Sequence, residues 1–263
     1  MDKAVIIRPF GFLGFHLCMK LLDEGIEVVG IHIGGSSHSS SSFEEKRMEI
    51  GRNANFIETD YLSEELEHTS VIFIDAYDLY FRGNKQEILI YTNIIKSIQK
   101  KTTGKIIFLL PNQILLENNE VHNKHRHMLT TNSIQEIYLP TVFGPWQPEE
   151  FTFQHFLVSK LKGNSEWTVN KTEDTEDAIF VRDVVEAIFE LITNSDEKIV
   201  IKHQEKNSWY ECAQYLKIPT NQGNNKKLVS EGNIKIKRIQ PGITAEEGLE
   251  EQKRQIKHLI EER

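Results

Sequence analysis

The segment KAVIIRPFGFLGFHLCMKLLDEGIEVVGIHI (Lys3–Ile33) has the order strand, glycine turn, helix, strand. Its first strand is predicted at Ala4–Ile7, because an unbroken apolar, mostly β-branched run is typical of a strand buried on both faces. Over Leu13–Asp23 the apolar residues recur on one helical face, and Gly25 follows where that helix should end. Glu27–Ile33 then has strand character again. This order predicts the first strand–helix–strand unit of a parallel sheet covered by helices.

The same alternation continues along the chain. Further strands are predicted at residues 55–58, 71–74, 105–110 and 135–139, and helices at 43–50, 85–100, 151–161, 181–192 and from 244 onward. The predicted fold class is α/β: a Rossmann-type doubly wound parallel sheet over residues 1–141. Residues 142–263 are predicted to form a small C-terminal α/β cap that packs on the first region and is not independent.

Two sequence patterns predict where the later helices begin. Asp183 is followed three residues later by Glu186, and Thr244 is followed three residues later by Glu247. In a capping box, a short polar side chain at the helix start and an acidic side chain three residues on bind each other's backbone N–H groups. Both pairs are therefore predicted as helix N-termini.

Composition excludes several classes of protein. The chain has 263 residues, of which 39% are hydrophobic, so it can bury a core and is not disordered throughout. Its 31 basic and 39 acidic residues give a net charge of −8, opposite to the basic excess of nucleic-acid binders. No segment approaches the roughly 18 consecutive apolar residues of a membrane span. With two cysteines and no cleavable signal peptide at its start, we expect a cytoplasmic protein with no membrane or nucleic-acid partner.

The turn after the first strand is the candidate phosphate site. It reads RPFGFLG, with Phe12 and Leu13 between the glycines at positions 11 and 14. In a doubly wound fold this turn leads into a helix N-terminus, where the backbone can bind a phosphate. Gly11 and Gly14 match the last two glycines of a G-x-x-G-x-x-G fingerprint. The alternative interpretation is that both glycines only let the helix pack closely on the sheet.

Four blocks in order resemble the extended short-chain dehydrogenase/reductase family, the NAD-dependent epimerase/dehydratase group. The first is Lys3–Ile33. Leu139–Gln147 is similar to the family's R-x-x-x-V-Y-G-P segment in the version of the sugar-nucleotide epimerases. Glu176–Ile188 resembles its R-D-F-x-Y-V-D-D-V-x-x-A-I block, and Glu247–Glu250 resembles its E-G-L-x-x-T helix. The blocks together extend over essentially the whole chain.

The resemblance implies a dinucleotide site at the glycine pair, with Asp60 near the adenine, and a C-terminal cap for a sugar nucleotide. Two residues depart from the family at this site. Arg8 replaces the first fingerprint glycine, so its side chain should enter the pyrophosphate space unless it binds a phosphate itself. His32 replaces the acidic acceptor for the ribose hydroxyls of NAD. The implied cofactor is NAD or NADP, with NADP favoured because Arg8 is near, unless the dinucleotide is lost.

The catalytic residues that the resemblance implies are also replaced. Pro111 stands after the fifth strand, where the family has a serine or threonine. The family then has a Y-x-x-x-K helix, whose tyrosine transfers the proton and whose lysine lowers the tyrosine pKa. No tyrosine occurs between Tyr91 and Tyr138, and if Lys124 is the matching lysine, Glu120 takes the tyrosine position.

Acidic residues flank the end of the fourth strand, where the family has a small apolar stretch beside the cofactor. Asp75 and Asp78 would repel a pyrophosphate there. The alternative is a turn in which the two aspartates cap backbone groups.

Two functions from different classes remain open. The first is a degenerate family member without Tyr/Lys redox catalysis that acts as a nucleotide-binding or scaffolding protein, with a homodimer formed through helices around Ile95 and Leu129. The second is an active sugar-nucleotide epimerase or reductase that uses Glu120 or His122 as the base together with Lys124. No metal site is predicted, because the histidines of residues 122–127 do not share one helical face.

Overall fold

The computed structural model describes residues 1–32, 41–59, 71–82, 98, 104–115, 134–163, 167–170, 172–219 and 234–261. Its large sheet is built from eight strands: β1 (Lys3–Ile7), β2 (Glu27–Ile31), β3 (Phe56–Thr59), β4 (Val71–Asp75), β5 (Lys105–Pro111), β6 (Ile134–Leu139), β9 (Lys198–His203) and β10 (Lys235–Ile239). A second sheet pairs β7 (Thr141–Phe143) with β8 (Ala178–Phe180). The helices within the described residues are α1 (Phe12–Asp23), α2 (Ser41–Ile50), α3 (Leu79–Arg82), the 3₁₀ helix η2 (Asn112–Leu115), α6 (Thr152–Leu161), α7 (Val181–Leu191), α8 (Ser208–Tyr215) and α9 (Ala245–Glu261).

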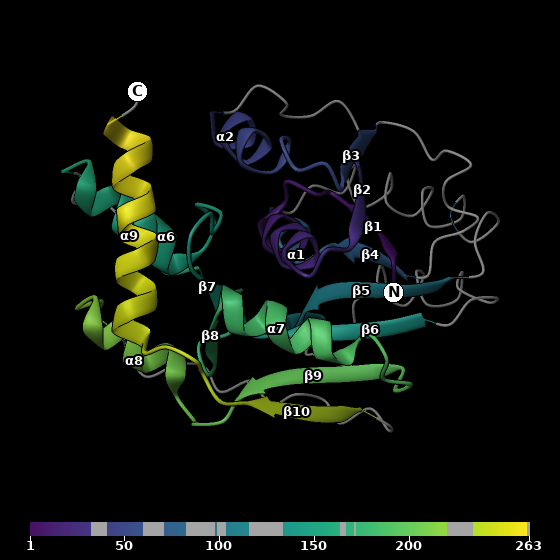
Figure 1. Cartoon of the computed structure of the whole chain (residues 1–263). Coiled ribbons are helices and arrows are strands. Elements are labelled where there is room, and N and C mark those ends of the chain that lie inside the picture. The colour runs from purple at the N-terminus through teal and green to yellow at the C-terminus, as the bar shows by residue number, and fades with distance from the viewer. Residues whose placement is uncertain are drawn as a thin grey trace. The chain divides into compact units, whose positions relative to one another are not determined.

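The strand order confirms the predicted fold class. It is β10-β9-β6-β5-β4-β1-β2-β3, labelled in Figure 1. The stretch β3-β2-β1-β4-β5-β6 has the order of a doubly wound, Rossmann-type sheet. β1 pairs in parallel with β2 on one side and with β4 on the other, and β4 pairs in parallel with β5. Parallel neighbours require crossover helices that cover the sheet, which explains why these strands are almost continuously apolar.

Helix α1 covers the strands at the centre of this arrangement. Its buried side chains, which include Leu13, Leu17 and Leu21, face β1, β2 and β4. The helix begins at Phe12 and its last turn is followed by Gly25 at φ 75°, whose N–H binds the Leu22 carbonyl oxygen at 3.0 Å. A glycine tolerates this left-handed conformation without a steric penalty, so the predicted helix and its predicted end are confirmed.

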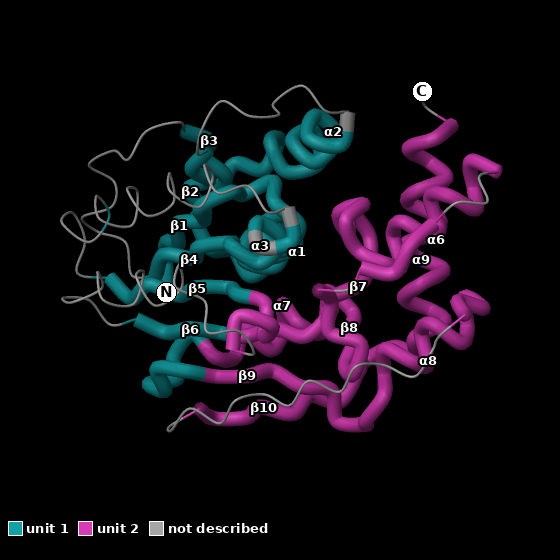
Figure 2. Tube along the Cα trace, turned by 180° about the vertical axis from the view of Figure 1, so that it is seen from behind, with its two compact units in different colours: residues 1–110, 118–137, 192–198 teal, residues 111–117, 138–191, 199–263 magenta. Residues whose placement is uncertain are grey.

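The chain divides into two compact units, coloured in Figure 2. Unit 1 contains residues 1–110, 118–137 and 192–198, and unit 2 contains residues 111–117, 138–191 and 199–263. Within unit 2, α6 packs against α9 through Leu157, Val158 and Ile256. No helix in the described part of the chain is both long and apolar enough to cross a membrane.

One of the two predicted capping boxes is confirmed. At α9, Thr244 and Glu247 bond reciprocally: the Thr244 N–H binds Glu247 Oε2 at 2.8 Å, and the Glu247 N–H binds Thr244 Oγ1 at 3.2 Å. The capping box predicted at Asp183 is wrong. Helix α7 begins two residues earlier, directly after β8, and Asp183 Oδ1 instead accepts the N–H of Gly242 at 3.1 Å.

The surface predicted for a homodimer lies outside the described residues. Both Ile95 and Leu129 fall there, as does most of the helix predicted at 85–100.

Candidate functional site

The predicted phosphate turn lies between β1 and α1 in unit 1. The Gly11 N–H donates to the Arg8 carbonyl oxygen at 2.9 Å and closes the turn. A Cβ atom on Gly14 would overlap that same carbonyl oxygen, and a Cβ on Gly11 would overlap the Asp75 carboxylate. Atoms of this chain therefore leave no room for a side chain at either position, so both must be glycine.

Arg8 has a positive φ angle, a backbone conformation that glycine adopts more readily than any other residue. Its φ is +64°, in the left-handed region, which costs a non-glycine residue about 1–2 kcal/mol. Its guanidinium forms a fork with the Asp78 carboxylate, in which Nη1 pairs with Oδ1 and Nη2 lies 3.0 Å from Oδ2. Nη1 also donates to the carbonyl oxygen of Asp75 at 3.2 Å. The Arg8 side chain is thus held by the last residue of β4 and by Asp78, three residues after it.

Asp75, the last residue of β4, binds the N-terminus of α1. Its Oδ2 accepts the N–H of Gly14 at 2.9 Å, and its Oδ1 accepts the N–H of Tyr77 at 3.3 Å. The Tyr77 bond is the aspartate-capped turn that the sequence allows. The Gly14 bond places a carboxylate at a helix N-terminus that an external anion would otherwise use.

The electrostatics of this cluster are dominated by burial. Asp75 and Asp78 are each 1% exposed. Burial, and after it the nearby Asp78 charge, raise the pKa of Asp75 to about 6. The positive charge of Arg8 and the two backbone N–H bonds act in the opposite direction. At neutral pH these three side chains therefore place two carboxylates against one guanidinium in a mostly buried site.

The end of β2 holds a second group of polar and aromatic side chains. His32 Nε2 lies 2.9 Å from Glu58 Oε1, and Arg47 Nε lies 2.9 Å from the other Glu58 oxygen. The imidazole stacks on the ring of Phe10 at 5.3 Å between centroids and also contacts Phe43. The Glu58 carboxylate thus lies beside His32, the residue that replaces the family's ribose acceptor. This carboxylate belongs to β3 and not to the end of β2. Glu58 was not among the predicted site residues, although an acidic residue at the end of the strand predicted at 55–58 was a usable signal.

The remaining predicted site residues divide into two groups. Phe12 and Leu13 are buried in the first turn of α1, so their side chains pack in the core. Pro111 is the last residue of β5 and is also buried. Asp60 and the three predicted catalytic residues Glu120, His122 and Lys124 lie outside the described residues, so their placement stays a prediction.

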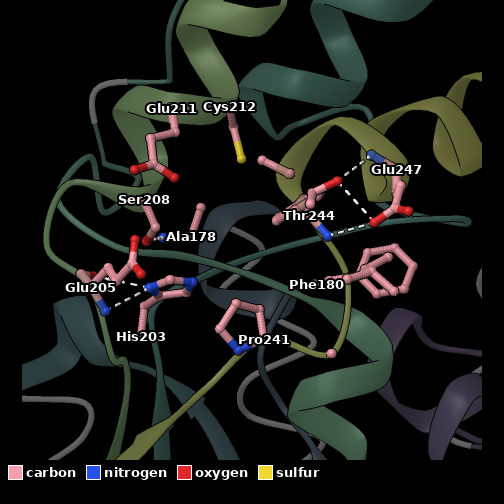
Figure 3. Close-up of a pocket in the computed structure, with 14 residues that line it drawn as sticks. Ala178, Phe180, His203, Glu205, Ser208, Glu211, Cys212, Pro241, Thr244 and Glu247 are labelled. Atoms are coloured by element: carbon pink, nitrogen blue, oxygen red, sulfur yellow. Dashed lines mark hydrogen bonds between the residues drawn. The ribbon is translucent and has the colours of Figure 1, made fainter.

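Unit 2 contains a cavity of about 350 Å³ beside α8 and the start of α9, drawn in Figure 3. In that view the Cys212 sulfur and the His203 ring face its centre. The His203 Nδ1 lies 3.0 Å from both the backbone nitrogen and the carbonyl oxygen of Glu205, so the backbone of Glu205 holds the ring in place. The described lining includes three glutamates and contains neither lysine nor arginine. Such a lining disfavours a phosphorylated ligand.

A buried carboxyl lies elsewhere in unit 2. Glu173 is 6% exposed, and its Oε2 accepts the N–H of Thr152 at 3.0 Å and the Thr152 hydroxyl at 2.5 Å. Burial raises the pKa of Glu173 to about 7, against the effect of these bonds. This carboxyl therefore titrates near neutral pH.

Solved structures share the fold of this chain over nearly its full length. UDP-glucuronic acid 4-epimerase from Bacillus cereus, in complex with UDP-glucuronic acid and NAD, is 18% identical with a TM-score of 0.71, covering 98% of this chain and 99% of that chain. dTDP-glucose 4,6-dehydratase from Bacillus anthracis, in complex with NAD, is 13% identical with a TM-score of 0.66, covering 99% and 98%. UDP-glucose 4-epimerase from Thermotoga maritima, with UDP-glucose, is 16% identical with a TM-score of 0.65, covering 98% and 99%.

Sequence comparisons add nothing to this likeness: no family model matches the chain, and no curated protein does. At 13–18% identity the structural likeness shows the fold alone. The fold is that of NAD-dependent epimerases and dehydratases, which is the group that the four sequence blocks resemble.

Proposed function

We propose that this chain is a degenerate protein of the epimerase/dehydratase fold that lacks Tyr/Lys redox catalysis and acts by binding or scaffolding. The observation that carries the proposal is the hydrogen bond between the Gly14 N–H and the Asp75 carboxylate at 2.9 Å. A dinucleotide in a doubly wound fold places its pyrophosphate at this helix N-terminus.

The residues at this turn do not fit a pyrophosphate. Its negative charge would approach the two buried carboxylates of Asp75 and Asp78, the second of which pairs with Arg8 in a fork. Two like charges at close range in a site of low dielectric repel each other by several kcal/mol. The cofactor is therefore proposed to be lost, which applies equally to NAD and NADP.

Two further features support the proposal. Pro111 has no hydroxyl for the proton transfer that the family assigns to that position. The described lining of the unit 2 cavity carries carboxylates and no cation, which is unfavourable for the diphosphate of a sugar nucleotide. The lack of a hydroxyl at Pro111 matters because removal of a general acid or base typically slows a reaction 10²–10⁴-fold.

A second candidate function is an active NAD(P)-dependent sugar-nucleotide epimerase or reductase with substituted catalytic residues. It is favoured by the retained glycine pair and by the fold likeness, since the similar solved proteins hold NAD and UDP-sugars. In this case Lys124 would act with Glu120 or His122.

A thermal-shift titration of the full chain separates the two candidates. NAD, NADP, UDP-glucose and UDP-glucuronic acid are each added up to millimolar concentration. A ligand at 100 times its Kd stabilises a protein by about 2.7 kcal/mol, which shifts the melting temperature measurably. We expect no shift with either dinucleotide. A shift with NADPH, together with sugar-nucleotide turnover that Lys124→Ala abolishes, would establish the second candidate instead.

A further inference from the structure

Three charged side chains gather at the N-terminus of α1. The Asp75 carboxylate binds the Gly14 N–H at 2.9 Å, the Asp78 carboxylate is forked by Arg8, and the guanidinium also binds the Asp75 carbonyl oxygen at 3.2 Å. Asp78 is 1% exposed and the Arg8 side chain 16%. These groups come from the ends of two adjacent parallel strands, so the sheet register itself brings them together.

A helix N-terminus carries a partial positive charge and unpaired N–H groups, which is why it attracts anions. The N-cap residue of α1 is Gly11, which has no side chain to bind these groups. Asp75 supplies the missing acceptor across 61 residues of sequence. A carboxylate and a phosphate oxygen both accept hydrogen bonds and are both negative, so they compete for the same donors.

The adjoining part of the turn is filled as well. Phe10 is 8% exposed and its ring packs on His32 and Phe43. Its carbonyl oxygen accepts the Lys46 ammonium of α2 at 3.1 Å. The Asp75 carboxylate thus occupies the position that an anion would take at α1. The aromatic side chains around Phe10 fill the space beside it.

We propose that Asp75 is an internal ligand that replaces a phosphate at α1, and that Asp75 and Asp78 together keep an otherwise competent anion site closed. The inference rests on the proposed function and extends it by naming the residues that block the site. With both aspartates neutralised, Arg8 and the Gly14 N–H become a site for a phosphate-type dianion. The net charge of the three side chains changes from −1 to +1 when both aspartates become asparagines.

Isothermal titration with inorganic pyrophosphate tests this inference. The full chain is compared with Asp75→Asn and with the double variant Asp75→Asn/Asp78→Asn, after circular dichroism has established that each is folded. Glu24→Gln is the matched control, because it removes one negative charge at the opposite end of α1, where Glu24 pairs with Lys20. We expect at least tenfold tighter pyrophosphate binding by the double variant, a smaller gain by the single variant, and no gain by the control.

Two results would overturn the inference: folded variants that bind pyrophosphate no better than the unchanged chain, or an equal gain in the control. If the double variant does not fold, the single variant decides, because its expected gain over the control is still measurable. The proposed function is tested separately, by adding dinucleotides to the unchanged chain. If the variants gain no pyrophosphate binding and the unchanged chain binds no dinucleotide, the inference is rejected while the proposed function stands.

Discussion

The free backbone N–H groups at the N-termini of α1 and α9 find their hydrogen-bond acceptors in opposite ways. α9 is capped by its own first turn, where Thr244 and Glu247 exchange hydrogen bonds at the surface. α1 is capped by Asp75, which is buried and lies 61 residues away in the sequence. Hydrogen bonds from Thr244 lower the pKa of Glu247, whereas burial raises the pKa of Asp75. A local cap stabilises its helix and leaves the surroundings open, whereas a remote buried cap also occupies the space in front of the helix.

The largest expected effect is on the ion pair that accompanies the remote cap. Asp78→Ala leaves the Arg8 guanidinium mostly buried without its fork partner, and breaking a buried pair in this way costs about 3–5 kcal/mol. Urea unfolding measures this loss. Adding Arg8→Gly should restore much of it, because the unpaired charge and the positive-φ strain both disappear.

The matched control for that prediction is a surface pair of unit 2. Arg182 Nη2 lies 2.7 Å from Glu251 Oε2, and the Arg182 side chain is 62% exposed. Arg182→Ala should cost less than about 1 kcal/mol. Equal losses at the two pairs would contradict the burial argument.

The second prediction concerns pH. Because the pKa of Asp75 in the folded protein is raised from its ordinary 3.8 to about 6, the folded state binds this proton more tightly than the unfolded state. The free energy of unfolding should therefore increase as pH falls through about 6, by about 3 kcal/mol once pH is below 4. Glu173 acts in the same direction near pH 7.

Urea unfolding of the unchanged chain and of Asp75→Asn at pH 8 and pH 5 isolates the Asp75 contribution. The variant should lose the part of the pH dependence centred near pH 6. Glu247 acts in the opposite direction, because its lowered pKa gives stability that is lost as pH falls below its ordinary range. Identical pH profiles of the two proteins would mean that Asp75 does not titrate in this environment.

The third prediction tests how tightly each helix start is packed. A Cβ on Gly14 would overlap the Arg8 backbone carbonyl, whereas a Cβ on Gly248 of α9 would approach ring carbons of Phe180 and Phe143 at 2.7 and 2.9 Å. Rings can shift more readily than a carbonyl fixed in a turn. Gly14→Ala should cost about 2 kcal/mol and Gly248→Ala less, as measured by thermal unfolding. The reverse order would contradict the assigned geometry of the turn.

The smallest expected effect is on the local cap. Thr244→Ala removes the hydroxyl that accepts the Glu247 N–H and should cost about 1 kcal/mol. Thr244→Ser keeps that hydroxyl and is the control, with a loss close to zero. Since this cap lies outside unit 1, neither variant should change pyrophosphate binding by the Asp75→Asn/Asp78→Asn double variant.

The elements of the fold were predictable because their signals are local. One strand–helix unit was predicted from the β-branched run before Arg8 and from the leucine spacing of α1. The start of α9 was predicted from the pair Thr244 and Glu247. The Asp183 prediction failed because β8 runs directly into α7, so that a residue with a capping sequence pattern lies inside the helix.

The contents of the candidate site were less predictable, because they depend on contacts between distant strand ends. The sequence predicted two aspartates at the end of the fourth strand and an arginine after the first, and it predicted that the aspartates would repel a pyrophosphate. It could not show that Asp75 turns toward Gly14 or that Arg8 pairs with Asp78. Those contacts follow from the parallel pairing of β1 with β4, which sets their carboxyl ends side by side.

The Gly14 amide reports directly on the bond at the centre of this account. An NMR titration between pH 4 and pH 8 follows its proton shift in the unchanged chain and in Asp75→Asn. Among the described residues, the charged side chains of Arg8 and Asp78 act on Asp75, and the Cys18 thiol of α1 lies within its electrostatic influence. We predict a change centred near pH 6 in the unchanged chain that the variant lacks. A Gly14 shift that is independent of pH, or that titrates equally in the variant, would contradict the assignment of Asp75 as the ligand of α1.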